Sequence, residues 1–542
     1  MFLDIFKRGK LQKISIITTL FLVFNLWIPL SMSADADITG AKIENTVAAS
    51  EAVDANKQNT ISSPTELEEP IINKPLAPTP ATLIEAKDLE EGIKYYTMYK
   101  VLNDGGMTKI NYVKVDPNRP RVEIRPAVAG GKSGVLQTLT DMSKPYGAVA
   151  AINGSFYYPG GQKSPVDTTI IDGQVMVQSP RMATSLIFTE DQQVYIDQFL
   201  PSTNIRIPAK KLIIQVDAIN RPCENGVVVF NNLYSNEVTN NGEGCIELVL
   251  NIEKDKQGNF IVGEVVQGSA TIPSNGIVLS FNGNSKDYAA YFAVGDKVVL
   301  DIDIDDENII HSMANGPLLV TKGCKTLPIR KEGLESGLWS RNPRSAVGIT
   351  TKGEVLLVVV DGRQEGSVGM TFDELADLML ELGAFDAMAL DGGGSSELVV
   401  EGDIVNSPAD GQERGISTGI LVICQIPIYI DGRRIYFELS EVAPVIEKGR
   451  IMVPVRKIFE QLGAELTWDN ETRTITATKG KASIQMKIGS TQAKANGKSV
   501  KLDAPPRIED GRTIVPLRFV SQAFGGKVEW NASSGSAYIT TH

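Results

Sequence analysis

The chain of 542 residues contains only two histidines, His311 and His542, and four widely spaced cysteines. So few histidines exclude a His-rich zinc site and argue against a Ser-His-Asp hydrolase. The cysteines, at positions 223, 245, 324 and 424, form no C-x-x-C pair, which excludes a zinc ribbon or a thioredoxin-type motif. Acidic residues outnumber basic ones, 65 to 53. The net charge of −12 argues against a nucleic-acid or anionic-membrane binder, because phosphate-rich surfaces attract basic ones.

Aromatic residues are absent from a long segment near the N-terminus. Residues 34–90 contain no Phe, Trp or Tyr, hold five prolines, and carry eleven acidic against four basic side chains. Such a segment cannot bury enough apolar surface to offset the entropy of ordering it. We therefore predict a flexible acidic linker over 34–91 and folded sequence from Gly92 onward. Elsewhere the composition, 42% hydrophobic and 22% charged, is typical of globular protein, and the length predicts two or three domains.

The first 33 residues have the pattern of an export signal. Four basic residues at 7, 8, 10 and 13 precede an apolar run from Ile14 to Leu30, and small residues follow. This pattern predicts a Sec-type signal peptide, with an uncleaved signal anchor as the alternative, because 17 apolar residues nearly suffice to span a bilayer. Either reading places the rest of the chain outside the cytoplasm, as an extracellular or cell-surface protein. There Cys223 and Cys245 could form a disulfide, although four free thiols are the preferred expectation.

The region 92–426 alternates short β-rich runs with turns, which predicts an α+β or mixed α/β domain built on a mixed β-sheet. The expected strands are 110–115, 122–124, 212–216, 226–230, 246–252 and 298–304. Near the end of this region, the apolar run Val355–Val360 predicts a buried strand. A capping box at 371–374 then opens a helix that ends at Gly383, and 387–390 is the next strand. Strand, helix and strand together predict a right-handed parallel crossover.

Polar residues follow both strands of this unit. Asp361 and Asp391 each stand at the carboxyl end of a strand, where open parallel sheets bind ligands, and Gly392–Gly394 follow the second aspartate. Arg344 and Arg363 offer planar donors for phosphate or carboxylate, so the combination predicts an anionic sugar substrate. Asp-Gly after a strand is also a common turn. The glycine run fits neither nucleotide-binding pattern, and Ser395 or Ser396 has no histidine to activate it as a nucleophile.

Five ordered motifs resemble the phosphodiester glycosidase family over residues 92–424. They are Asn153-Gly154-Ser155-Phe156, the run 341–348, Asp361-Gly362-Arg363, the run 390–396, and the run 406–414. The resemblance implies hydrolysis of a sugar-1-phosphodiester at the glycosidic bond, with an α-linked N-acetylhexosamine as the leading sugar. Ser155 and Tyr157 depart from the usual pattern, which leaves the identity of the sugar open.

The charges that develop in the implied reaction suggest roles for individual residues. Asp361 and Asp391 take the carboxylate roles, with Glu247 as a spare carboxylate, and which acid acts as nucleophile or base stays open. The expected substrate-binding residues are Asn153, Gly154, Arg344, Arg363, Gly392, Gly393, Gly394, Ser395, Asp410 and Arg414. No cofactor is required, and a divalent cation among the carboxylates stays possible. Two alternatives are a phosphodiesterase that cuts the P–O bond, although such enzymes use His- and Asp-rich metal clusters, and a non-catalytic surface scaffold.

The last 116 residues contain an internal repeat with an offset of 62. Gly449-Arg450-Ile451-Met452-Val453-Pro454-Val455-Arg456 matches the segment 511–518, and Trp468 matches Trp530. The pattern resembles the N-terminal "stalk" domain of copper amine oxidases over 427–542, which implies a small α+β module without copper chemistry. We expect its arginines to be structural or partner-contacting. The partners expected for the whole chain are a sugar-phosphodiester and a cell-wall polymer, with no nucleic acid, and a membrane only if the signal is an anchor.

Overall fold

The computed structural model describes residues 82–252, 259–304, 308–326, 339–438, 442–509, 511–532 and 534–541. The predicted signal peptide and most of the predicted linker lie outside these residues. Residues 82–90 do not belong to a linker, however, because they form strand β1 (Thr82–Glu90). Its side chains are mostly exposed, and it is held by antiparallel backbone pairing with β2 (Ile93–Val101), so composition could not distinguish it from linker. None of the helices in the described ranges has the length and hydrophobicity of a membrane-spanning helix.

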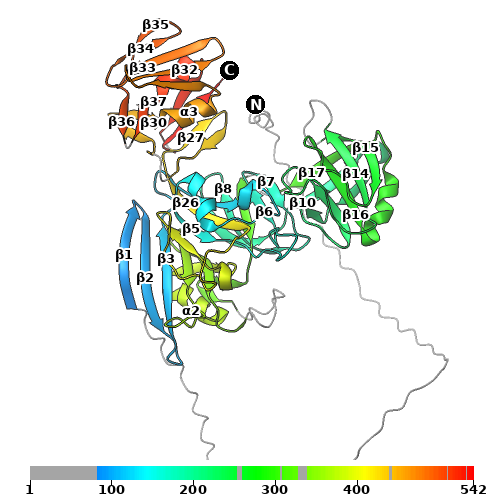
Figure 1. Ribbon diagram of the computed structural model, residues 1–542. Coiled ribbons are helices and arrows are strands. Elements are labelled where there is room, and N and C mark those ends of the chain that lie inside the picture. Colours follow the sequence, from blue (N-terminus) through cyan, green and yellow to red (C-terminus); the bar gives the residue numbers. More distant parts are fainter. Residues whose placement is uncertain are drawn as a thin grey trace, which may run out of the picture. The chain divides into compact units, whose positions relative to one another are not determined.

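The glycine loop follows strand β23 of an eight-stranded sheet in which neighbouring strands are antiparallel; the first three strands of this sheet are labelled in Figure 1. Its order is β1, β2, β3 (Met107–Val115), β22 (Val355–Val360), β21 (Arg344–Thr350), β23 (Ala384–Ala389), β19 (Leu318–Thr321) and β20 (Cys324–Lys325). β22 and β23 both run antiparallel to β21, so they are parallel to each other, with β21 between them. The parallel direction of the crossover is confirmed, and its helix α2 (Phe372–Glu381) has the predicted Thr371–Glu374 capping box.

A five-stranded sheet packs against the first one. Its order is β25 (Asp403–Ile404), β24 (Leu398–Val400), β5 (Ala148–Asn153), β26 (Thr418–Cys424) and β4 (Val122–Val128). One hydrophobic core contains side chains of both sheets, such as Val347 and Leu357 from the first and Ile152 and Ile420 from the second. Helix α2 covers the other face of the first sheet, and α1 (Leu139–Ser143) covers the other face of the second. Two sheets between two helices thus form the layers that carry the site.

Two further sheets lie between β5 and β19 in the chain. One has the order β7 (Gln174–Val177), β6 (Thr169–Ile171), β18 (Ile309–Ala314), β8 (Ala183–Thr189) and β9 (Val194–Phe199). The other has the order β11 (Leu212–Gln215), β10 (Ser202–Ile207), β17 (Lys297–Asp303), β15 (Asn259–Gln267), β14 (Ile246–Ile252), β16 (Gly276–Asn282), β13 (Gly226–Phe230) and β12 (Ala218–Ile219). The strands predicted from hydrophobic runs are confirmed. The described structure is mostly β-sheet, so the predicted α+β or mixed α/β class overstated the helices.

The C-terminal module has the predicted repeat. In each copy a strand ends at a proline, and a helix, a strand ending near the tryptophan, and a further strand follow. The first copy comprises β30 (Arg450–Pro454), α3 (Val455–Gln461), β31 (Glu465–Asp469) and β32 (Thr474–Lys479), and the second comprises β37 (Arg512–Pro516), α4 (Leu517–Ala523), β38 (Lys527–Asn531) and β39 (Ser536–Thr540). The remaining strands are β27 (Ile428–Ile430), β28 (Arg433–Ile435), β29 (Val445–Glu447), β33 (Ala482–Lys487), β34 (Gln492–Ala495), β35 (Lys498–Lys501) and β36 (Arg507–Glu509).

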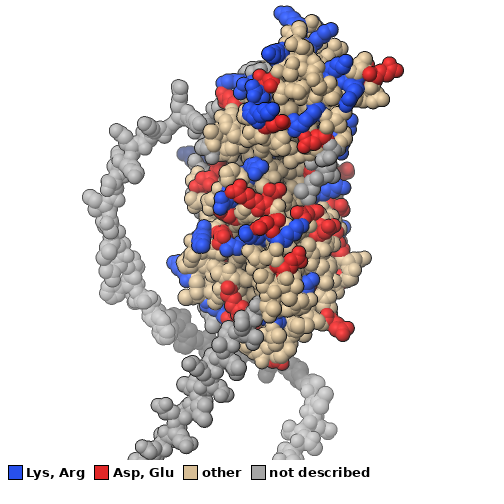
Figure 2. Space-filling model, turned by 90° about the vertical axis from the view of Figure 1, so that its left-hand side faces the viewer, with Lys and Arg blue, Asp and Glu red and all other residues tan. Residues whose placement is uncertain are grey.

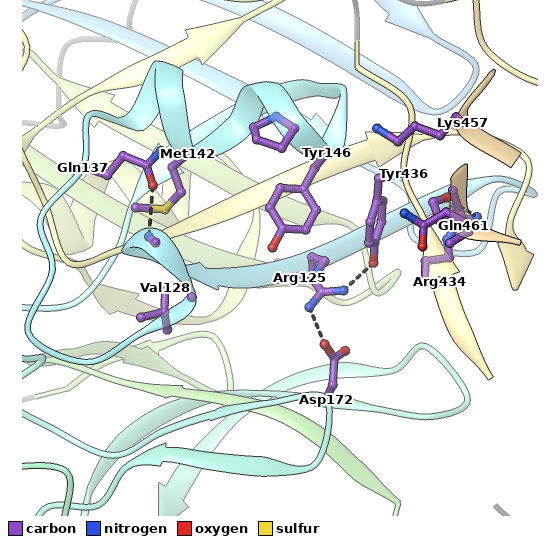
Figure 3. Close-up of a pocket in the computed structure, with 14 residues that line it drawn as sticks. Arg125, Val128, Gln137, Met142, Tyr146, Asp172, Arg434, Tyr436, Lys457 and Gln461 are labelled. Atoms are coloured by element: carbon purple, nitrogen blue, oxygen red, sulfur yellow. Dashed lines mark hydrogen bonds and ion pairs between the residues drawn. The ribbon is translucent and has the colours of Figure 1, made fainter. Parts of the chain in front are cut away.

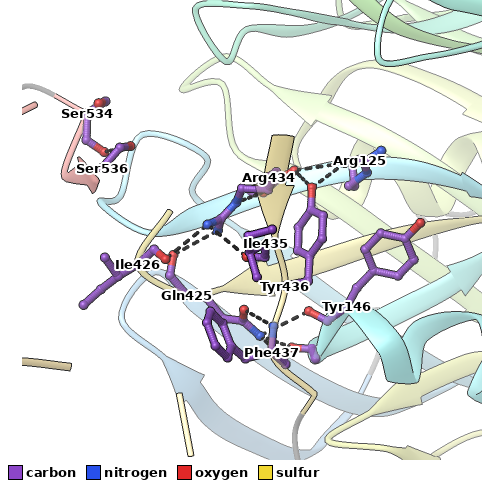
Figure 4. A network of polar contacts seen from close by, with 12 residues as sticks. Arg125, Tyr146, Gln425, Ile426, Arg434, Ile435, Tyr436, Phe437, Ser534 and Ser536 are labelled. Carbon is purple, nitrogen blue, oxygen red and sulfur yellow. Dashed lines mark hydrogen bonds and ion pairs between the residues drawn. The ribbon is translucent and has the colours of Figure 1, made fainter. Parts of the chain in front are cut away.

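Polar and aromatic contacts join this module to the preceding domain. The Arg125 guanidinium lies 5.5 Å from the Tyr146 ring centre and 5.4 Å from that of Tyr436, and it donates to Asp172 at 3.0 Å (Figure 3). These residues line a cavity of about 460 Å³. Beside it, the Gln425 side chain accepts from the Phe437 amide at 2.9 Å (Figure 4).

All four cysteines are free thiols in the described structure. Cys245 is buried, and its Sγ donates to Glu247 at 3.1 Å, while Cys223 Sγ contacts its own turn at the Asn225 carbonyl. The structure therefore agrees with the preferred expectation for Cys223 and Cys245.

Candidate active site

The two predicted aspartates lie at the same edge of the eight-stranded sheet. Asp361 directly follows β22, and Asp391 follows β23 after one residue, so the parallel direction of these strands brings both to one edge. One strand separates β22 from β23, which places the two backbones roughly 10 Å apart. Arg344 begins the antiparallel strand between them and therefore stands at this edge as well.

Asn153 fixes this edge to the second sheet. Its side chain is fully buried, its amide nitrogen donates to the Asp391 carbonyl at 2.6 Å, and its amide oxygen accepts from the Ser345 hydroxyl at 2.6 Å and from the Glu397 amide at 3.1 Å. Gly154 adds a backbone contact, because its carbonyl accepts from the Asp391 amide at 2.9 Å. Both residues were predicted to bind substrate. The structure shows contacts of both that position the segment carrying Asp391.

Asp391 has the electrostatic environment of a reactive carboxyl. Burial raises its pKa to about 6, and the Ser395 hydroxyl, the Gly392 amide and the Arg414 charge offset part of that shift. The Tyr157 hydroxyl belongs to the same group, since Arg414, Asp391 and Ser395 all act on its pKa, which burial raises. The sequence analysis treated Tyr157 only as a departure from the family pattern. Its position directly after the Asn-Gly-Ser-Phe motif was the signal that could have placed it at the site.

Two arginines flank the glycine loop. Arg363 is exposed and has a left-handed backbone (φ 59°), and a side chain placed on Gly393 would approach its guanidinium to 3.4 Å. Arg414 pairs with Asp410 at 2.5 Å, and this pair occupies the space that a side chain on Gly394 would need. The glycines therefore allow two guanidinium groups to approach the loop backbone closely.

Arg344 differs from these two arginines. It is buried, its Nε donates to the Met370 carbonyl at 2.8 Å, and one terminal nitrogen donates to the Ser340 carbonyl at 2.8 Å. Its guanidinium lies 3.9 Å from the centre of the Phe372 ring. Desolvation, followed by the charge of Arg363, lowers the pKa of Arg344 to about 10. These contacts give Arg344 a structural role in the loop 340–344 and the start of α2, beside its position at the site edge.

The side chain of Asp361 is more buried than that of Asp391. Its Oδ1 accepts from the Ser407 amide at 3.0 Å and from the Asn406 side chain at 3.2 Å, while Oδ2 is buried without a hydrogen-bond partner among the described residues. Burial raises the pKa of Asp361. It lines a cavity of about 310 Å³ together with Lys109, Gln364 and Ser407.

Glu397 is a further buried carboxyl at this site that sequence reasoning missed. It is 2% exposed, and burial raises its pKa to about 9, with Glu413 as the second cause. Glu413 in turn accepts from the Thr140 amide at 2.7 Å, at the start of α1. The signal was its place two residues after Ser395, directly behind the glycine loop. Two carboxyl groups that interact in this way favour the state with one shared proton.

Glu247 is not part of this group. It lies in β14, in the separate eight-stranded sheet that begins with β11, where its Oε1 accepts from the Ser280 hydroxyl at 2.9 Å and from the Cys245 thiol. Its prediction as a spare catalytic carboxylate rested on residue type alone, and its described contacts are those of a buried polar cluster. Among the described residues, no group of three or more His, Cys, Asp or Glu side chains is arranged to hold a metal ion.

Comparisons with known proteins match two separate parts of the chain. Residues 246–423 match the family model described as phosphodiester glycosidase, and residues 429–539 match that of the copper amine oxidase N-terminal domain. The N-acetylglucosamine-1-phosphodiester alpha-N-acetylglucosaminidase of Bos taurus is 35% identical over 85 residues, which are 15% of this chain and 16% of that protein. The SPbeta prophage-derived uncharacterized protein YomE of Bacillus subtilis is 41% identical over 76 residues, 14% of this chain and 12% of that protein.

This chain therefore spans less than a fifth of either relative's length. Among solved structures, a hypothetical protein from Synechocystis is similar in fold, with a TM-score of 0.57, 20% identity and coverage of 64% of each chain. The chain thus carries a phosphodiester glycosidase domain, followed by a copper amine oxidase N-terminal domain.

Proposed function

We propose that this site hydrolyses the glycosidic bond of a sugar-1-phosphodiester outside the cytoplasm. The observation that carries the proposal is the arrangement of Asp391 beside a glycine loop that two arginines, Arg363 and Arg414, approach. The carboxylate would face the positive charge that develops on the sugar, and the guanidinium groups would bind the phosphate. The name of the bovine relative supports an α-linked N-acetylhexosamine as the sugar, and the basic and apolar segment 7–30 supports export.

The chemistry follows from the charges of the two halves of the substrate. Cleavage of the C1–O bond develops positive charge on the sugar ring and negative charge on the departing phosphate. Asp391, with a pKa of about 6, is ionised at neutral pH and faces the positive charge as nucleophile or as base toward water. A phosphate monoester leaves readily, so protonation of the leaving group contributes less than for an ordinary glycoside.

The leaving phosphate is bound by the arginines. Arg363 is exposed beside Gly393, and Arg414 lies against Gly394, so both can donate to phosphate oxygens together with the loop backbone. Asp410 holds the Arg414 guanidinium in place through its 2.5 Å contact. Such preformed donors stabilise charge as it grows in the transition state.

The experiment is hydrolysis of synthetic N-acetylhexosamine-1-phosphodiesters by the purified chain in water labelled with heavy oxygen. The proposal expects free sugar as a product, with the label on C1. Label in the phosphate instead would show that the P–O bond is cut, and the proposed bond would be wrong. An Asp391→Asn preparation provides the matched background.

A further inference from the structure

We infer that the C-terminal module binds a repeating anionic sugar–phosphate polymer through two equivalent surface sites, each built from an exposed tryptophan and arginines of both repeats. This function is separate from hydrolysis and stands whether or not the catalytic site acts as proposed. The repeated Gly-Arg-x-x-Val-Pro-x-Arg motif, which the catalytic site does not use, supplies the arginines.

The first site is a groove of about 430 Å³ on the module. Ile446 and Arg450 line it from the first repeat and the strand before it, and Arg518 and Trp530 line it from the second repeat. Trp530 is 44% exposed and Ile446 is 53% exposed, although large apolar side chains are normally buried. The groove thus joins the first arginine of one motif to the second arginine of the other.

The second site follows from the symmetry of the repeat. β30 and β37 pair antiparallel, and Val453 lies opposite its own equivalent, Val515, so a local twofold axis passes through this pair. Through this axis the groove residues Ile446, Arg450, Arg518 and Trp530 have the equivalents Ile508, Arg512, Arg456 and Trp468. Ile508 is 43% exposed and Trp468 is 41% exposed, close to the values of their equivalents. Both copies therefore expose the same apolar pair.

The excess of basic residues in the module favours an anionic ligand. The module has 17 basic and 12 acidic residues, whereas the whole chain has 53 and 65. Basic side chains are numerous on the face of the module seen in the upper part of Figure 2. Arg456 and Arg518 are exposed and make no ion pair with any residue that the structure describes. In the groove, Asp503 lies 3.7 Å from Arg450 and compensates that arginine in part.

An exposed tryptophan beside an uncompensated guanidinium suits a sugar ring next to a phosphate. The C–H face of a sugar packs on the indole ring, and the guanidinium donates to two phosphate oxygens. Two equivalent sites suit a ligand that repeats its own groups along its length, because binding at the first site raises the effective concentration at the second. A sugar–phosphate polymer has both properties.

The test measures binding of the full chain, as Asp391→Asn to prevent turnover, to a purified polyol phosphate polymer that carries N-acetylhexosamine. Neutral N-acetylglucosamine oligomers and inorganic polyphosphate serve as comparison probes. We expect the polymer to bind at least about tenfold more tightly than either probe. Trp468→Ala or Trp530→Ala should weaken binding about tenfold, and the double variant about 100-fold, since each anchor at such a surface contributes strongly.

Controls make the outcome specific. Arg456→Ala and Arg518→Ala should weaken binding to a similar degree, whereas Lys494→Ala, which removes an exposed charge on β34, should change it less than twofold. Trp468→Phe with Trp530→Phe should retain most binding and confirms that the module stays folded. Unchanged binding by the double Trp→Ala variant, or equal losses in Lys494→Ala, would overturn the inference. So would a change from dimer to monomer in the double variant without loss of polymer binding, because the surface would then contact a second copy.

Discussion

At the scale of single residues, the carboxyl groups of the site differ in their surroundings and therefore in their pKa. Asp391 is partly exposed and has a pKa of about 6, while Glu397 is almost fully buried and has a pKa of about 9. Asp361 is buried with one oxygen hydrogen-bonded to the 406–407 turn. At neutral pH, Asp391 is thus the carboxylate best placed to meet a substrate, and Glu397 keeps its proton.

Asp391→Asn should lower turnover by roughly 100-fold or more, because a positioned carboxylate is lost. The proposed activity of the unsubstituted protein should fall as pH falls below about 6, where Asp391 becomes protonated. The stability of the Asp391→Asn variant should not fall. Burial raises the pKa of Asp391, so its ionisation opposes folding above that pH, and asparagine removes this cost. Turnover across pH 4.5–8 with a thermal melt checks both points, and an unfolded variant would indicate a structural aspartate instead.

Glu397→Gln should change how stability depends on pH. The folded state raises the pKa of Glu397 from 4.5 to about 9, so the folded protein holds a proton that the unfolded chain releases. Stability of the unsubstituted protein therefore falls as pH rises from about 4.5 to 9, and glutamine removes this contribution. The melting temperature of the variant, relative to the unsubstituted protein, should rise between pH 5 and 9. The exposed Glu365→Gln is the control, and a constant difference across pH would contradict the prediction.

Arg363→Lys and Arg344→Lys should have different effects, although the sequence predicted phosphate binding for both. Arg363 is exposed at the loop and donates to the Asn342 side chain at 3.0 and 2.7 Å, so Lys should cost roughly 10- to 100-fold in kcat through loss of a two-oxygen contact, with a smaller loss of melting temperature than in Arg344→Lys. Arg344 donates to two carbonyl groups and packs on Phe372, so Lys should cost about 1–3 kcal/mol of stability. Steady-state kinetics and thermal melts on each variant separate the two effects. Equal melting temperatures and equal losses of kcat in the two variants would indicate that both arginines bind the phosphate.

At the scale of elements, hydrophobic runs and caps predicted strands and the crossover helix well, because burial and capping are local in sequence. The strands at 226–230 and 246–252 have the predicted bounds, and the Thr371–Glu374 box starts α2. β1 was missed because its pairing uses backbone groups while its side chains are exposed. The antiparallel order of the sheet was missed because β21 inserts between β22 and β23, a long-range pairing that no local pattern encodes.

The same limit applies to the site. Asp391 and the glycine loop were predictable because they follow a strand directly. The contacts among Asn153, Ser345 and Glu397 were not, because residues nearly 250 positions apart meet there.

Gly394→Ala tests the loop as an element. Its methyl group would enter the space of the Asp410–Arg414 pair, so the pair must move away from the loop backbone. We expect at least about a tenfold loss of turnover, because a positioned guanidinium is displaced from the phosphate. Gly161→Ala is the matched control, since a methyl group there meets no atom within 4 Å. Kinetics with a sugar-1-phosphodiester provide the measurement, and normal turnover by Gly394→Ala would contradict the arrangement of the loop.

At the scale of the whole molecule, the proposed hydrolysis and the proposed polymer binding lie in different domains. The described site residues lie between 153 and 414, and the repeat module begins at 427. The two domains are nevertheless in contact, because the Tyr436 hydroxyl donates to Glu123 at 2.8 Å and its ring packs on Arg125. Separation of the domains should therefore affect stability before it affects chemistry.

Deletion of 427–542 should leave turnover of a small, soluble sugar-1-phosphodiester within about threefold, because none of the site residues described above is removed. The melting temperature of the remaining domain should fall, since Arg125 and Tyr146 lose the ring that covers them.

The variant Tyr436→Phe in the full chain isolates part of this contact. It removes the hydroxyl that bonds Glu123 and keeps the ring, so its melting temperature should lie between those of the full and truncated chains. Turnover of a long sugar–phosphate polymer should fall far more in the truncated chain than turnover of the small substrate, because the module no longer holds the polymer near the site. A truncated protein that is folded but inactive on the small substrate would show instead that the module shapes the active site.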